Sequence, residues 1–130
     1  MHLTPLTARK VGKAFENLIS IEVEKELGNV IVIPLKDLTI STQFTDVLVI
    51  TDKYIIGIEC KVTTAEVFHV KNKRQIIKLK KLTLLNKQAK GFLITHLAYK
   101  EAFSFNNIRI LDVDSGNILN WKEWINAIKN

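Results

Sequence analysis

The sequence predicts an α/β fold in which a central, mixed β-sheet is flanked by helices. Three observations support this prediction: an amphipathic helical segment opens the chain, two strongly apolar strand segments follow, and helical and strand patterns then alternate. The predicted order is a helix, three strands, a second helix, two strands and a last helix. We expect residues 1–130 to form a single domain, because a chain of this length can bury one core.

The first helix is predicted from about Thr7, its candidate N-cap, to Leu27, where Gly28 supplies a stop signal. One face of this helix is an apolar stripe that would pack on the sheet, and Glu16 lies at the edge of that stripe. The stripe consists of Ala8, Val11, Phe15, Leu18 and Ile19, and the polar side carries Arg9, Lys10, Lys13 and Asn17.

Three strand segments follow the first helix. They span residues 29–33, 45–51 and 54–62. Pro34 ends the first of them, and the polar residues 36–43 predict a loop. The second and third segments are separated only by Asp52 and Lys53, so we expect an antiparallel hairpin. Both hairpin strands are apolar on both faces, which is typical of central strands that are covered on each side.

The rest of the chain predicts a helix, two strands and a last helix. These elements span residues 71–88, 92–95, 107–113 and 119–128. The inner face of the first of these helices is predicted to comprise Ile76, Leu79, Leu82 and Leu85, and its basic residues are Lys73, Arg74, Lys78, Lys80, Lys81 and Lys87. For Trp121 and Trp124, on the last helix, a subunit interface is favoured over base stacking.

Composition narrows the classes of protein that this chain can be. The net charge is +6, which favours a polyanionic partner, although a solvated basic face is the alternative. The single Cys60 excludes an internal disulfide framework and a cysteine zinc site. Because the N-terminus lacks a signal-peptide pattern and no apolar run approaches membrane-spanning length, we expect a protein without a membrane partner in the cytoplasm, either of a cell or of an infected host cell.

Charged residues interrupt the two apolar hairpin strands. Because strand side chains alternate, Glu59 and Lys61 should share one face of the sheet, and the hairpin should bring Asp46 beside them. Two carboxylates beside a lysine suit a hard cation such as Mg²⁺, and this set predicts phosphodiester hydrolysis in which Lys61 positions or deprotonates the attacking water. The competing interpretation is a structural cross-strand ion pair.

Three other side chains have simpler interpretations. Cys60 alternates with the charged residues and is most simply a small core residue. His96 is interpreted as a surface or hydrogen-bonded histidine. His69 is likewise interpreted as a surface or hydrogen-bonded histidine and not as a catalytic one. Its place before the basic helix would allow a contact with DNA.

The spacing of these residues resembles a known family. Asp46 followed by Glu59-Cys60-Lys61 resembles the core motif of the PD-(D/E)XK nucleases, with Thr45 where the motif has proline. Residues 12–19, in which a glycine and a lysine precede Glu16, resemble the first helix of archaeal and archaeal-virus Holliday-junction resolvases. Residues 75–79, beginning with Gln75, resemble their second helix.

The resemblance implies a restriction-endonuclease-like fold and a homodimer that cuts four-way DNA junctions with Mg²⁺ or Mn²⁺. Its active site would consist of Glu16, Asp46, Glu59 and Lys61, with the carbonyl of Cys60 as a further metal ligand. The candidate DNA contacts are Lys10, Lys13, Ser41, Thr42, His69, Lys73, Arg74, Gln75, Lys78 and Lys81. Because the chain has little length to spare for base readout, recognition by shape is favoured. Another PD-(D/E)XK repair or restriction nuclease, or a non-catalytic basic DNA-binding module, are the alternatives.

Overall fold

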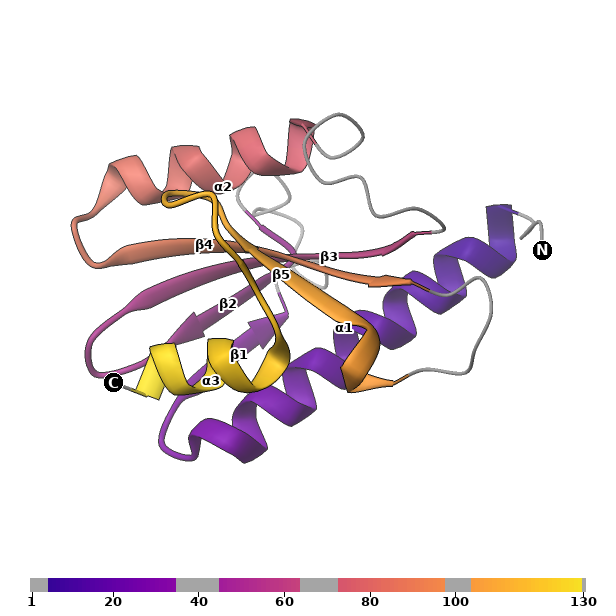
Figure 1. Cartoon of the computed structure of the whole chain (residues 1–130), viewed down its shortest axis with the longest axis horizontal. Helices are drawn as coiled ribbons and strands as arrows, with labels where there is room; N and C mark the ends of the chain where they lie inside the picture. Colours follow the sequence, from indigo (N-terminus) through magenta and orange to yellow (C-terminus); the bar gives the residue numbers. More distant parts are fainter. Residues whose placement is uncertain (1–4, 35–44, 64–72, 98–103, 130) are drawn as a thin grey trace.

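The computed structural model describes residues 5–34, 45–63, 73–97 and 104–129, and a six-stranded β-sheet forms its centre (Figure 1). The strands lie side by side in the order in which they occur along the chain. They are β1 (Ile31–Pro34), β2 (Val47–Ile50), β3 (Ile55–Thr63), β4 (Ala89–Leu97), β5 (Ile108–Asp112) and β6 (Ile118–Leu119).

The sheet is mixed, as predicted. β3 and β4 are parallel, and every other neighbouring pair is antiparallel, including the predicted hairpin of β2 and β3. A parallel pair needs a crossover connection, and helix α2 (Lys73–Leu85) lies on the path from β3 to β4. A short 3-10 helix, η2 (Phe105–Asn107), precedes β5.

Helices cover both faces of the sheet. α2 lies on one face, while α1 (Pro5–Leu27) and α3 (Trp121–Lys129) lie on the other (Figure 1). This arrangement confirms the predicted α/β class and explains why the two central hairpin strands are apolar on both faces. Among the described residues, no helix combines the length and the apolar character needed to cross a bilayer.

The larger part of the core lies between the sheet and the pair α1 and α3. Phe15 and Ile19 of the predicted apolar stripe are buried there, together with Phe92 of β4. Trp124 is fully buried in this core and packs edge-on against Phe92, with ring centroids 5.6 Å apart. The expected role of Trp124 in a subunit interface is therefore wrong, because α3 turns this face of the helix toward its own sheet. Trp121 is half-buried beside it.

A smaller core joins α2 to the other face of the sheet. Leu79 is fully buried there against Leu93 and Leu111. The helix can approach the strands closely because glycines stand beneath it: a Cβ atom at Gly57 would overlap Leu82 Cδ2, and one at Gly91 would lie 2.9 Å from Leu79 Cβ. These two glycines therefore allow the side chains of α2 to come close to β3 and β4.

Several predicted boundaries differ from the observed ones. α1 begins at Pro5, where proline is favoured because its fixed φ suits a first helical turn. α2 ends at Leu85, so Leu85 is 69 % exposed and its predicted place on the inner face is wrong. β4 is longer than predicted. α3 begins only at Trp121, because Leu119 belongs to β6. Asn120 caps this helix: its side-chain oxygen accepts a hydrogen bond from the N–H of Glu123. The predicted loop 36–43 lies outside the described residues.

Candidate active site

Asp46 and Glu59 face each other where β2 begins. Val47 pairs with Ile58 in the antiparallel register, and the Asp46 N–H donates to the carbonyl of Ile58 over 3.2 Å, so Asp46 and Glu59 are the next residues across. Val47 and Ile58 pack into the core beneath α1 and α3. Glu59 alternates with Ile58, so its side chain turns toward the α2 face, and it is 4 % exposed. Asp46, in the bend just before β2, is 5 % exposed, and its carboxylate lies close enough to act on the charge of Glu59.

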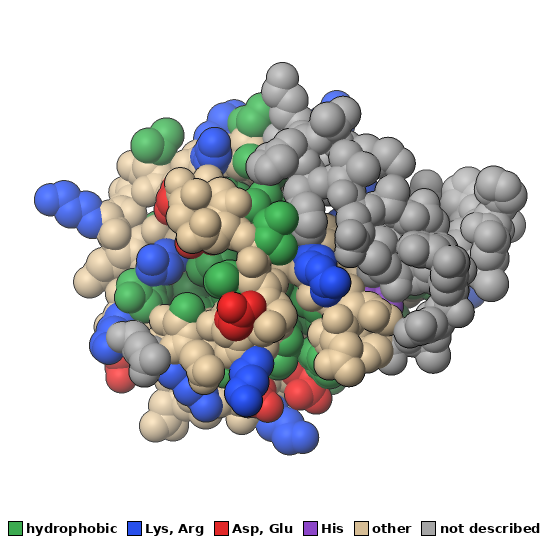
Figure 2. Space-filling view, in the orientation of Figure 1, with side chains coloured by type: hydrophobic (Ala, Val, Ile, Leu, Met, Phe, Trp, Pro, Cys, Tyr) green, Lys and Arg blue, Asp and Glu red, His purple; other side chains and the backbone are tan. Residues whose placement is uncertain are grey.

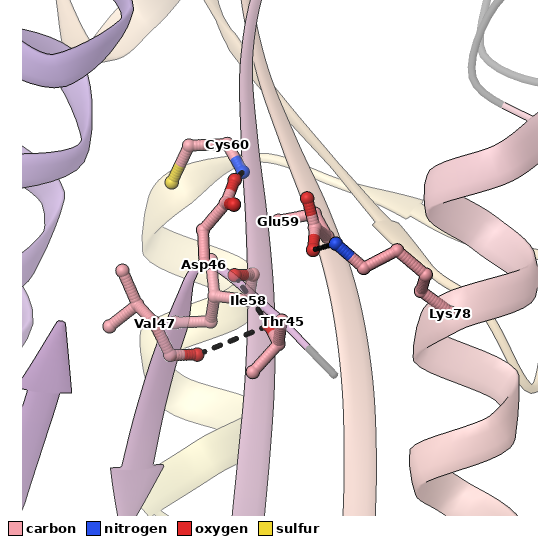
Figure 3. A network of polar contacts seen from close by, with 7 residues as sticks. All are labelled: Thr45, Asp46, Val47, Ile58, Glu59, Cys60 and Lys78. Atoms are coloured by element: carbon pink, nitrogen blue, oxygen red, sulfur yellow. Dashed lines mark hydrogen bonds and ion pairs between the residues drawn. The ribbon is translucent and has the colours of Figure 1, made fainter. Parts of the chain in front are cut away.

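The backbone around the two carboxylates is held by side-chain hydrogen bonds (Figure 3). The Cys60 N–H donates to Asp46 Oδ2 over 3.1 Å, which holds this carboxylate against β3. The hydroxyl of Thr45 donates to the carbonyl of Ile58 over 2.7 Å. Thr45 stands where the resembled motif has proline, and its buried hydroxyl ties the start of β2 to β3 by a bond that a proline could not make.

Lys78 of α2 reaches down to the carboxylates. Its Nζ lies 2.9 Å from Glu59 Oε1, and Figure 3 shows the side chain spanning the space between helix and sheet. The sequence predicts Lys78 only as a DNA contact and does not predict this ion pair. A signal was present: Lys78 is three residues after Gln75 and four before Leu82, so all three share the helical face that is turned toward the sheet.

Burial and like charge shift the protonation of Glu59. Desolvation is the larger cause and the negative charge of Asp46 the second, and together they raise the pKa of Glu59 from 4.5 to about 7, against the opposing effect of Lys78. At neutral pH the two buried carboxylates therefore hold less than their full negative charge. A pair with this property is typical of a site that binds a cation or transfers a proton.

Lys61 and Cys60 take opposite faces of β3, as predicted. Lys61 is two residues beyond Glu59 on the same face, is half-buried, and lies beside Thr95 of the parallel strand. The Cys60 side chain packs against the core on the α1 side, which confirms its interpretation as a small core residue. Because an extended residue turns its N–H and its C=O to the same neighbouring strand, the Cys60 carbonyl faces the β2 side, as does the N–H that binds Asp46.

Glu16 is positioned differently from the other predicted site residues. It is buried, at 8 % exposure, beside Phe15 on α1, which covers the face of the sheet opposite α2. Among the residues that the structure describes, no group of three histidine, cysteine, aspartate or glutamate side chains is arranged to hold a metal ion. The structure thus brings Asp46 and Glu59 together, and it does not gather Glu16 with them into a three-ligand cluster.

The predicted DNA contacts other than Lys78 differ in exposure and in whether the structure describes them. Lys10, Lys13, Arg74 and Lys81 are exposed, whereas Gln75 is half-buried and its Oε1 has no hydrogen-bond partner among the described residues. Lys73 begins α2. Ser41, Thr42 and His69 lie outside the described residues. On the face drawn in Figure 2, lysine and arginine side chains stand at several separate points and do not form one continuous patch.

His96 lies away from the carboxylates. It is buried on the α1 side of β4, where its ring packs 5.9 Å from that of Phe15 and its Nε2 accepts a hydrogen bond from the Ser104 N–H. Burial lowers the pKa of His96. The interpretation of His96 as a hydrogen-bonded histidine is confirmed.

The donor set of the site is compatible with a small divalent cation. Mg²⁺ is commonly bound in proteins by one or two carboxylates, with waters and substrate phosphate as its other ligands. Asp46 and Glu59 supply two adjacent carboxylates, and burial together with the charge of Asp46 raises the pKa of Glu59 although Lys78 is paired with it. The residues present therefore fit such an ion without a third carboxylate.

The comparisons with known proteins support the fold and leave the family open. No protein-family model matches the sequence, and no curated protein matches it. Among solved structures, the chain is similar to Hjc, a Holliday junction resolvase from the archaeal hyperthermophile Archaeoglobus fulgidus, with a TM-score of 0.56 and 14 % sequence identity. The similarity covers 85 % of this chain and 89 % of the other. The chain therefore has the α/β fold of this nuclease.

Proposed function

We propose that this chain is a metal-dependent DNA endonuclease of the PD-(D/E)XK kind that cuts four-way junctions. The observation that carries the proposal is the buried pair of Asp46 and Glu59, in which burial and, second, the negative charge of Asp46 raise the pKa of Glu59 to about 7. If the two carboxylates were purely structural, neighbouring positive groups and hydrogen-bond donors would be expected to balance their negative charge. Two buried carboxylates whose charge is not fully balanced suit a bound cation. The fold shared with a resolvase supports the same conclusion.

The proposed chemistry assigns a role to each residue of the strand pair. Asp46, Glu59 and the carbonyl of Cys60 would hold Mg²⁺ or Mn²⁺. When bound, the cation would stabilise the charge that develops on the scissile phosphate. Lys61, on the same face as Glu59, would orient the attacking water and donate to the reacting phosphate. Glu16 is included because of the resemblance of its helix to the first helix of the resolvases.

The proposed substrate is recognised by shape. The net charge of +6 and the exposed basic side chains of α1 and α2 suit phosphate contacts, which do not depend on base sequence. Two symmetric cuts in a four-way junction need two active sites, so the proposal includes a homodimer.

The decisive experiment compares a labelled four-way junction with a linear duplex of the same sequence, each with Mg²⁺ and with chelator. We expect metal-dependent, paired cuts in the junction at rates well above those in the duplex. Equal cutting of both substrates would favour a repair or restriction nuclease of the same superfamily. Light scattering at the assay concentration checks the dimer, and a monomer that still makes paired cuts would contradict that part of the proposal.

A non-catalytic DNA-binding module is the second candidate. Two observations favour it: Lys78 already supplies a positive charge to Glu59, and the described part of the chain contains no three-ligand metal cluster. This candidate predicts that the junction is bound equally well with Mg²⁺ and with chelator and is never cut. Cleavage that disappears in Asp46→Asn, with binding retained, excludes it.

A further inference from the structure

Lys78 differs in the direction of its side chain from Arg74, Lys80 and Lys81, the other basic residues of α2 whose side chains are described. Arg74, Lys80 and Lys81 are exposed, whereas the side chain of Lys78 is only 26 % exposed. It crosses from the helix to the sheet and ends 2.9 Å from Glu59 Oε1 (Figure 3). The side chain of Glu59 is 5 % exposed, so this ammonium group sits on one of the most buried acidic groups of the described chain.

The ion pair engages one oxygen of a carboxylate that a divalent cation would use. Asp46 Oδ2 accepts from the Cys60 N–H, and Glu59 Oε1 is held by Lys78. A cation bound between the two carboxylates would share these acceptors and would repel the ammonium group at close range. The ammonium group of Lys78 can move away from Glu59 into solvent, because it is carried on a flexible four-carbon stem that is partly exposed.

Resting on the nuclease function proposed above, we infer that Lys78 is the internal counter-cation of this site, paired with Glu59 in the metal-free protein and displaced when a divalent cation binds to Asp46 and Glu59. In the metal-free protein, Lys78 offsets part of the free-energy cost of burying the two carboxylates. It also competes with the metal ion for Glu59. If Lys78 does not compete with the cation, its removal should leave the affinity for the cation unchanged.

The test is a Mn²⁺ titration in the absence of DNA, with free Mn²⁺ measured by electron paramagnetic resonance at pH 8.0 under nitrogen. The wild-type protein is compared with Lys78→Met, Lys78→Arg and the matched control Lys81→Met, in which an exposed lysine of the same helix is changed. Asp46→Asn identifies the binding that belongs to this site.

We expect Lys78→Met to bind Mn²⁺ at least about fivefold more tightly than the wild type, because its competitor is gone. Lys78→Arg, which keeps the charge, and Lys81→Met should stay within about twofold of the wild type. Binding that depends on Asp46 but is equal or weaker in Lys78→Met overturns the counter-cation role and leaves the proposed nuclease intact. An absence of any binding that depends on Asp46 overturns both.

A second measurement uses only the wild-type chain, so it does not depend on whether Lys78→Met folds. Brief acylation with acetic anhydride, followed by mass spectrometry, measures the acylation rate of each lysine. This rate is higher when the amino group is exposed and is not held in an ion pair. Saturating Mn²⁺ should raise the acylation rate of Lys78 by about threefold or more and leave that of Lys81 unchanged. The same experiment on Asp46→Asn should show no effect of Mn²⁺, and an unchanged rate at Lys78 in the wild type would overturn the inference.

Discussion

The backbone N–H of Cys60 donates to Asp46 Oδ2 across the β2–β3 pair, at 3.1 Å. This bond joins residues that are 14 apart in sequence and holds the Asp46 carboxylate against the strand that carries Glu59. The position of Asp46 is therefore set by backbone geometry, while Glu59 takes its partner from a helix side chain, Lys78. Mutations of the two carboxylates should therefore have different effects.

Asp46→Asn separates a metal site from a structural ion cluster. In a metal site, this change removes a crowding negative charge from the metal-free protein, so the melting temperature should hold or rise while junction cleavage falls at least about a hundredfold. In a structural cluster, it should instead cost about 3–5 kcal/mol of stability. Melting temperature, junction affinity and single-turnover cleavage are measured together, and a destabilised variant that cuts at the wild-type rate refutes the assignment.

The stability of the metal-free protein should depend on pH through Glu59. Its pKa is raised from 4.5 to about 7, so between these values the folded protein keeps a proton that the unfolded chain has lost. The free energy of unfolding should therefore fall as pH rises from 4.5 through 7, by about 3 kcal/mol at most, and remain low above that.

Glu59→Gln should remove this part of the pH dependence. Urea unfolding at pH 5 and pH 8 checks it, with Glu26→Gln, an exposed position on α1, as the control that should follow the wild type. Parallel pH profiles for wild type and Glu59→Gln would show that Glu59 does not titrate in this range.

Lys61→Ala should bind the junction but fail to cut it. Lys61 is proposed to act on the reacting phosphate and its water, so its loss should lower single-turnover cleavage at least about a hundredfold with little change in affinity. Lys87→Ala, at an exposed position in the turn after α2, is the control for loss of a positive charge. If both variants lose affinity equally and keep their cleavage rate, Lys61 only contributes charge.

Exposed basic residues of α2 should supply affinity and not chemistry. Neutralising Arg74 and Lys81 together should weaken junction binding and reduce the slope of log affinity against log salt by about one unit for each lost phosphate contact. Lys122 and Lys129, exposed on α3 at the other face, are the matched control pair. A slope that changes only for the α3 pair would place the DNA on the opposite face of the sheet.

Local sequence patterns were sufficient to predict the hairpin and the proximity of Asp46 and Glu59. A two-residue turn fixes which strand pairs with which, and alternation then assigns Glu59 and Lys61 to one face and Cys60 to the other. The apolar character of both faces indicated covering helices, and the structure has them. These features depend on residues close in sequence, whose geometry is set by short-range periodicity.

The partners that come from distant segments were decided by tertiary packing. In the sequence Lys78 is one basic residue among many, and its contact with Glu59 comes from the packing of α2 on the sheet, where Gly57 and Gly91 leave room for the helix. Trp124 was assigned to an interface, whereas the return of α3 over the sheet buries it. Periodicity predicts which side of a helix is apolar. How deeply a side chain is buried depends on the shape of the surface on which the helix packs, and that surface is formed by strands far away in the sequence.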